Sequence, residues 1–145
     1  MDASDFITFA GRTVNLGKAG ARSAISRAYY GAFHIACDIL LELNARVPRG
    51  GKSHNLVPQY IHSANHALGT LAAKMLLDLH TERIRADYDM SSESVERPEL
   101  ARLRVESALE VQRLLEQFRQ DCRADPGLRQ QLHDGVAKVK AVHKA

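Results

Sequence analysis

Hydrophobic residues recur at every third or fourth position along most of this chain, which is the spacing of one face of an α-helix. The clearest run extends from about Arg22 to Asn44 and predicts a long helix there. Similar patterns predict further helices over about 3–16, 55–66, 70–88 and 98–123. The sequence therefore predicts an all-α fold, an up-and-down bundle of four or five helices.

Turn-forming residues separate the predicted helices. Gly17 and Gly20 are expected to end the first one, the stretch 47–55 predicts a loop, and the polar stretch 89–97 predicts another. Asp-Pro-Gly at 125–127 ends the last long helix, and the residues beyond it form either a weakly amphipathic basic helix or a frayed tail. We expect an N-terminal helical segment, a central bundle and a C-terminal basic helix or tail, at 1–20, 21–124 and 125–145.

The amino-acid composition excludes several classes of protein. Apolar residues make up 45% of the chain and charged residues 26%, which excludes disordered and fibrous classes. The apolar runs are short and the first ten residues carry two acids, so we expect no membrane association, no secretion signal and a cytoplasmic location. Cys37 and Cys122 are expected to be reduced, buried thiols. The net charge of +3 is too small to indicate nucleic-acid binding by itself.

One side of the long predicted helix is polar. It lies opposite the apolar face and comprises Ser23, Arg27, Tyr30, His34 and Asp38. Arg27 and His34 stand two turns apart, about 10 Å along the axis, so long side chains can converge on a ligand between them. Such a stripe is either a solvated surface or a binding site. Gly31 within the helix costs about 1 kcal/mol and indicates that a partner helix or a ligand approaches the backbone closely.

A second cluster of charged residues ends the helix predicted over 70–88. Arg85 and Tyr88 share a side of it, whereas Asp87 lies elsewhere and is expected to pair with an Arg of a neighbouring helix. Asp87 and Asp89 stand at the negative end of the helix dipole, where acids need cationic partners. The polar stripe of the long helix is the expected source of those partners.

Two other patterns in the sequence are weaker evidence for a functional site. His62 and His66 have the spacing with which two imidazoles share a metal ion on a helix, but no third ligand is indicated, so we expect no metal and no cofactor. The run Pro-Arg-Gly-Gly-Lys-Ser at 48–53 lacks the preceding strand and the full spacing of a phosphate-binding loop. It is expected to be a flexible basic loop first, with Lys52 and His54 as secondary candidates for contact with RNA phosphates.

Three strings, in this order and spacing, resemble the HEPN domain family (higher eukaryotes and prokaryotes nucleotide-binding). They are RSAISRAYYGAFHIACDIL at 22–40, Ser53-His54, and RIRADYD at 83–89, followed by a further long helix. The resemblance spans roughly residues 20–120. It implies a helical bundle that usually dimerises and is often encoded beside a minimal nucleotidyltransferase. Many members are metal-independent endoribonucleases in toxin–antitoxin or phage-defence systems.

In those nucleases, an Arg followed after four to six residues by a His carries the chemistry at the dimer interface. No His follows Arg85 at positions 90–92, and the Arg-to-His pair with the right gap is Arg27 and His34. An Arg can hold two phosphate oxygens, and a His can move the proton of an attacking 2′-hydroxyl group. We therefore take Arg27 and His34 as the candidate catalytic residues.

The other candidate residues are expected to bind the substrate in the same groove: Tyr30, Arg85, Asp87, Tyr88, His54 and Lys52. Tyr88 is also a candidate for nucleotidyl modification, because some toxins of the family are silenced on a Tyr near their motif. The expected function is an RNA-targeting toxin or defence effector, a homodimer controlled by a nucleotidyltransferase antitoxin. The alternatives are a non-catalytic module that binds a nucleotide or a protein, and a structural subunit whose charges saturate one another.

Overall fold

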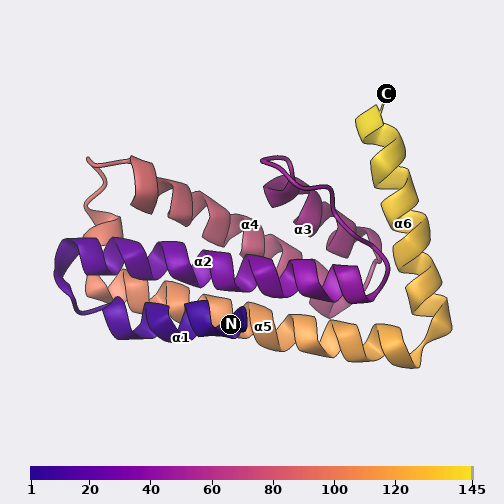
Figure 1. The fold of residues 1–145 in the computed structure, drawn as a ribbon, viewed down its shortest axis with the longest axis horizontal. Coiled ribbons are helices and arrows are strands. Elements are labelled where there is room, and N and C mark those ends of the chain that lie inside the picture. Colours follow the sequence, from indigo (N-terminus) through magenta and orange to yellow (C-terminus); the bar gives the residue numbers. More distant parts are fainter. Residues whose placement is uncertain (145) are drawn as a thin grey trace.

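The computed structural model describes residues 1–144, and in that part of the chain it contains helices and no strand. The predicted all-α helical bundle is confirmed, with six α-helices and one 3-10 turn among the described residues (Figure 1). The elements are α1 (Ser4–Thr13), α2 (Gly17–Glu42), α3 (Ser53–Ser63), α4 (Ala67–Tyr88), η1 (Ser94–Glu96), α5 (Pro98–Ala124) and α6 (Pro126–Lys144).

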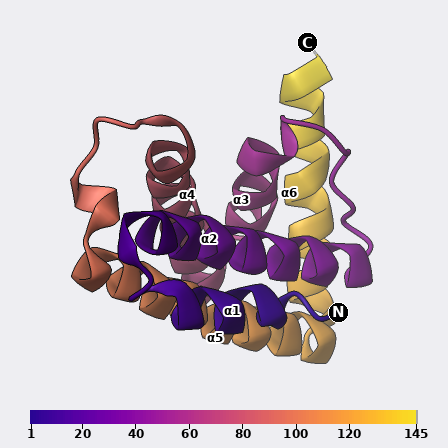
Figure 2. The same ribbon diagram turned by 60° about the vertical axis from the view of Figure 1, so that its left-hand side comes forward.

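Three long helices form the centre of the bundle. α2, α4 and α5 all pack against one another, with α2 and α5 running in one direction and α4 in the other (Figure 1). α1 lies along α2, on the outside of this trio. α3 packs between α4 and α6, as Figure 2 also shows, and α4 does not contact α6.

The core is built mainly from the apolar stripes that the sequence pattern predicts. Large side chains with at most 1% exposure come from all three central helices, among them Ile25 and Leu40 on α2, Leu76 on α4, and Leu114 and Phe118 on α5. Full burial of such a side chain contributes roughly 1.5–3 kcal/mol. α2 and α5 each touch four of the other α-helices, so the rest of the bundle is arranged around this pair.

Two glycines explain how closely α1 approaches α2. A Cβ atom on Gly31 would lie 2.6 Å from Ile7 Cγ1, so the close neighbour of this backbone is a helix, not a ligand. A Cβ atom on Gly20 would lie 2.5 Å from the Thr13 carbonyl oxygen. The prediction that Gly20 lies between helices is therefore wrong: α2 begins at Gly17, whose positive φ of 76° makes the turn.

Two other boundaries differ from the prediction. α3 begins at Ser53, inside the predicted loop, and Pro58 consequently lies within the helix and not in its first turn. Of the two alternatives for the C-terminal segment, the helix is the one observed. It packs on α3 at Gly135, where a Cβ atom would lie 2.4 Å from the Ser63 carbonyl oxygen.

Both cysteines are free, with Cys122 buried and Cys37 partly exposed. Burial is the main cause that raises the pKa of each thiol to about 11, so both stay protonated at neutral pH. Among the described residues, no helix is both long and apolar enough to cross a lipid bilayer.

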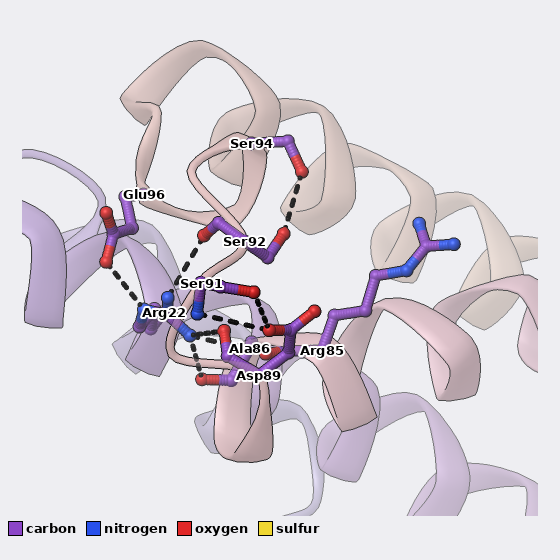
Figure 3. Close-up of polar contacts among 8 residues, drawn as sticks. All are labelled: Arg22, Arg85, Ala86, Asp89, Ser91, Ser92, Ser94 and Glu96. Carbon is purple, nitrogen blue, oxygen red and sulfur yellow. Dashed lines mark hydrogen bonds and ion pairs between the residues drawn. The ribbon is translucent and has the colours of Figure 1, made fainter.

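A buried arginine joins α2 to the C-terminal end of α4, where the Arg85 carbonyl oxygen also accepts a hydrogen bond from the Asp89 N–H group. The Arg22 Nη1 atom donates to the carbonyl oxygens of Arg85, Ala86 and Asp89 at 3.0–3.2 Å (Figure 3). Its Nη2 atom donates to the Ser92 carbonyl oxygen, and its Nε atom donates to the Glu96 carboxylate, both at 3.0 Å. We call this arrangement the Arg22 clamp.

The clamp predicts a large effect of removing one side chain. Arg22→Met should lower the free energy of unfolding by about 3 kcal/mol, because buried carbonyl groups and Glu96 lose their partner. The matched control is Arg85→Met: the Arg85 side chain is 53% exposed, bonds only to Glu82 within residues 1–144, and should change stability by less than about 0.5 kcal/mol. Urea unfolding followed by circular dichroism measures both values, and equal effects would contradict the clamp.

Candidate functional site

Side chains from three helices meet in one cluster of rings and charges. Residues three, four or seven positions apart share one face of a helix, and the members of the cluster on α2 and on α4 have such spacings. His54, in the first turn of α3, completes the set. We call this set the ring cluster, and it comprises Tyr29, Tyr30, Phe33, His54, His80 and Arg83.

The inner part of the ring cluster is a stack of two imidazoles. The rings of His54 and His80 lie 5.0 Å apart and are nearly parallel, at 6°. Phe33 stacks on the His54 ring at 4.6 Å, and the fully buried Tyr29 ring lies 5.1 Å from His80. The Tyr29 hydroxyl group is 2.7 Å from His54 Nδ1. These contacts fix the orientation of both imidazole rings.

Burial and charge together keep these imidazoles neutral. Desolvation is the main cause that lowers the pKa of His54 and of His80, and the nearby Arg83 guanidinium lowers both further. His80 and His34 add to the effect on His54. Burial raises the pKa of the Tyr29 hydroxyl group, so this group keeps its proton and shares a hydrogen bond with the neutral His54 ring at Nδ1.

Arg83 connects the ring cluster to the polar side of α2. Its side chain is 8% exposed, and its Nη2 atom donates to the Tyr30 hydroxyl oxygen at 2.8 Å. Its guanidinium group lies 4.9 Å from the centre of the Tyr30 ring and pairs with the Asp87 carboxylate at 3.7 Å. Asp87 also accepts a hydrogen bond from Ser26. Arg83 therefore holds Tyr30 from the buried side of the site.

The outer face of Tyr30 carries the two candidate catalytic residues. The Arg27 guanidinium lies 5.4 Å from the centre of the Tyr30 ring, and the His34 ring lies 6.3 Å from it. His34 is also stacked on Phe6 of α1, at 5.8 Å. Both Arg27 and His34 are exposed, and within residues 1–144 neither side chain has a hydrogen-bond or ion-pair partner. The structure thus brings the predicted pair to one ring without neutralising either group.

Two hollows of about 500 Å³ flank this line of residues. One lies against α1, beside Arg27, and is lined by Phe6 and Phe9. The other lies beside His34, and Arg46 and Arg49 of the loop after α2 line it. Each hollow also has one carboxylate, Asp5 or Asp38, among the described residues. Arginines and aromatic rings therefore continue on both sides of Tyr30.

The remaining predicted substrate-binding residues fall into two groups. His54 and Asp87 belong to the region around Arg83, although Asp87 pairs with Arg83 of its own helix, so the expected pairing with a neighbouring helix is wrong. The structure does not bring the others to Tyr30. The Arg85 side chain points away from α2 (Figure 3), Tyr88 is 73% exposed, and Lys52 lines a different hollow, against α3.

The sequence analysis missed His80, Arg83 and Tyr29 as members of the site. A usable signal was present, because His80, Arg83 and Asp87 follow one another at spacings of three and four and so share a face of α4. Likewise, Arg22 supplies the bonds to the end of α4 that were expected from the polar stripe, but it binds backbone carbonyl groups and not the acids.

His62, in the last turn of α3, and His66, the N-cap of α4, are not arranged as metal ligands. Both ring nitrogens of His66 are used: Nδ1 accepts from the Gly69 backbone at the start of α4, and Nε2 bonds to Asp121 at 2.7 Å. The bond from His66 is the main cause that lowers the pKa of Asp121. No group of three potential metal ligands occurs in the part of the chain that the structure describes.

Comparisons with known proteins do not assign this chain to a family. The chain matches no protein-family model, no curated protein and no solved structure. The resemblance to HEPN domains therefore remains a prediction from the sequence.

The neutral imidazole stack predicts a pH dependence of stability. Because the pKa values of His54 and His80 lie below 6.5 in the folded state, stability is fully present above pH 6.5 and is lost as the pH falls. His80→Phe should reduce the loss of free energy of unfolding between about pH 7.5 and 5, since one of the two groups no longer titrates. Urea unfolding at each pH measures this difference. The control is His62→Gln at an exposed position, which should keep the wild-type dependence of the free energy of unfolding on pH. The same dependence in His80→Phe would contradict the prediction.

Proposed function

We propose that this protein is an RNA-targeting effector that holds a single strand across Tyr30 and cleaves it without a metal ion, using Arg27 and His34. One observation carries the proposal: an unpaired guanidinium and an unpaired imidazole flank one fixed aromatic ring, between two hollows that contain further arginines and phenylalanines. Proteins that bind single strands combine cationic side chains along the backbone with rings on which bases stack.

The chemistry fits the two side chains. A neutral His34 can take the proton from a ribose 2′-hydroxyl group, whose oxygen then attacks the adjacent phosphorus. The bond from phosphorus to the 5′ oxygen breaks, a 2′,3′-cyclic phosphate forms, and the leaving oxygen takes a proton from solvent. The Arg27 guanidinium can bind two phosphate oxygens and offset the charge that develops there. Arg83, with its pairing to Tyr30 and Asp87, positions the ring between them.

The HEPN resemblance adds a homodimer and a nucleotidyltransferase-like antitoxin to this proposal. Tyr88, 73% exposed near the end of α4, is accessible to such an enzyme. A role in toxin–antitoxin or phage-defence systems belongs to the same proposal.

Binding and cleavage are separated by two variants. Arg27→Ala should weaken binding of a labelled single-stranded RNA and lower the slope of log affinity against log salt by about one, because one phosphate contact is lost. His34→Ala should leave binding within a few fold and reduce cleavage in the presence of chelator by roughly 10²-fold or more. Fluorescence anisotropy and gel analysis of the products provide the two measurements.

The matched controls are Arg113→Ala and His62→Ala, both on exposed residues away from Tyr30. They should behave as wild type. If RNA binds in an Arg27-dependent way but is not cleaved, the protein is a non-catalytic binding module, the alternative function. If RNA does not bind, or if cleavage is unchanged in His34→Ala, the proposal is rejected.

A further inference from the structure

A second hollowed surface lies apart from Tyr30. Two adjoining hollows of about 360 and 370 Å³ lie over the outer side of α3, and both are lined by Gln59 and Leu77. α3 lies between α4 and α6 in both Figure 1 and Figure 2. Residues of α4 line both hollows, and His143 of α6 lines the first. We call this surface the α3 groove, lined by Leu56, Pro58 and Gln59 of α3, Ala73 and Leu77 of α4, and His143 of α6.

The α3 groove is apolar along its length. Leu77, at the point shared by the two hollows, is 42% exposed, although it is a large apolar side chain. His143 Nε2 lies 3.0 Å from Gln59 Oε1, which connects α6 to α3 beside the first hollow. Contiguous exposed apolar surface with a polar rim is typical of protein interaction sites.

Every charge along the α3 groove is positive or can become so. Lys52 lines one hollow and Lys74 the other, and the titratable groups beside them are His62 and His143. Within residues 1–144, no Asp or Glu lines either hollow. A ligand that complements this surface therefore carries carboxylates around an apolar stripe.

The shape of the α3 groove favours a helix as the occupant. Its floor is one helix of 11 residues, about 16 Å long, which matches about three turns of a second helix. Amphipathic helices bind such grooves through apolar residues at positions i, i+3 or i+4, and i+7. No Phe or Tyr lines either hollow among the described residues, so the groove lacks the rings on which RNA bases stack.

We therefore propose that the α3 groove binds an acidic amphipathic helix of a partner protein, and a second copy of this chain is the other occupant that the test distinguishes.

The test uses the full chain and three synthetic helical peptides of about four turns. The first has Leu at positions i, i+4 and i+7 with Glu elsewhere, the second replaces Glu by Lys, and the third replaces Leu by Ser. Fluorescence anisotropy measures affinity, and amide chemical shifts locate the peptide. We expect the Glu peptide to bind with shifts centred on Gln59 and Leu77, and both altered peptides to bind at least about tenfold more weakly.

Substitutions in the α3 groove make the test specific. Leu77→Asp should weaken binding of the Glu peptide at least about tenfold, whereas Leu71→Asp should not, because Leu71 is equally exposed on α4, at 45%, but lines neither hollow. Lys52→Glu combined with Lys74→Glu should reverse the preference, so that the Lys peptide binds better. Circular dichroism verifies that each variant is folded.

Several outcomes would overturn the proposal. They are no binding of the Glu peptide at about 1 mM, equal binding of the Glu and Lys peptides, and shifts centred on Tyr30. Self-association that is lost in Leu77→Asp would show that a second copy covers the α3 groove. RNA binding does not enter any of these readouts, so the α3 groove and the proposed RNA function stand or fall separately.

Discussion

The arrangement of this bundle depends on a guanidinium group that closes the end of a neighbouring helix. The Arg22 clamp donates to carbonyl groups at the end of α4 and holds the segment after it against α2. Because the far end of α4 is fixed in this way, the face that carries His80, Arg83 and Asp87 is turned toward α2. The ring cluster is thus a consequence of how one helix ends.

The inner and the outer residues around the ring cluster differ in their burial and in the partners that they contact. The inner imidazoles are partly desolvated and lie near a cation, which keeps them uncharged. The outer pair, Arg27 and His34, stays in contact with water and is free of internal partners among the described residues. Tyr30 belongs to both layers, since its hydroxyl group bonds inward to Arg83 and its ring faces outward. A rigid inner layer therefore supports an outer layer that a ligand can reach.

Local spacing in the sequence was sufficient for the fold class and for part of the site. The rhythm of Ile25, Tyr29 and Leu40 determined the long helix, and the relation between Arg27 and His34 follows from helical geometry alone. Contacts between helices could not be obtained in this way. Gly20 is of a residue type common in turns, yet it lies within α2, where the lack of a side chain lets the end of α1 approach closely.

The same limit explains the residues assigned to the wrong place. Arg83 and Arg85 are chemically alike and two positions apart, but only Arg83 faces α2. Which of the two is buried depends on the rotation of α4, whose apolar residues Leu76 and Leu79 are buried in the core. Lys52 and His54 are similarly close in sequence, but Lys52 lines a hollow of the α3 groove, whereas His54 bonds to Tyr29 in the ring cluster. Long-range packing, not local propensity, decides such cases.

The positions of the two ends of the bundle have a practical consequence for work with this protein. Met1 lies in the hollow beside Arg27, whereas His143, near the end of α6, lies at the α3 groove. An affinity tag or fluorescent fusion joined at Met1 would emerge next to one surface, and one joined after α6 would emerge next to the other. The choice of terminus for a tag is therefore not neutral, and a pair of oppositely tagged proteins would shield the two surfaces one at a time.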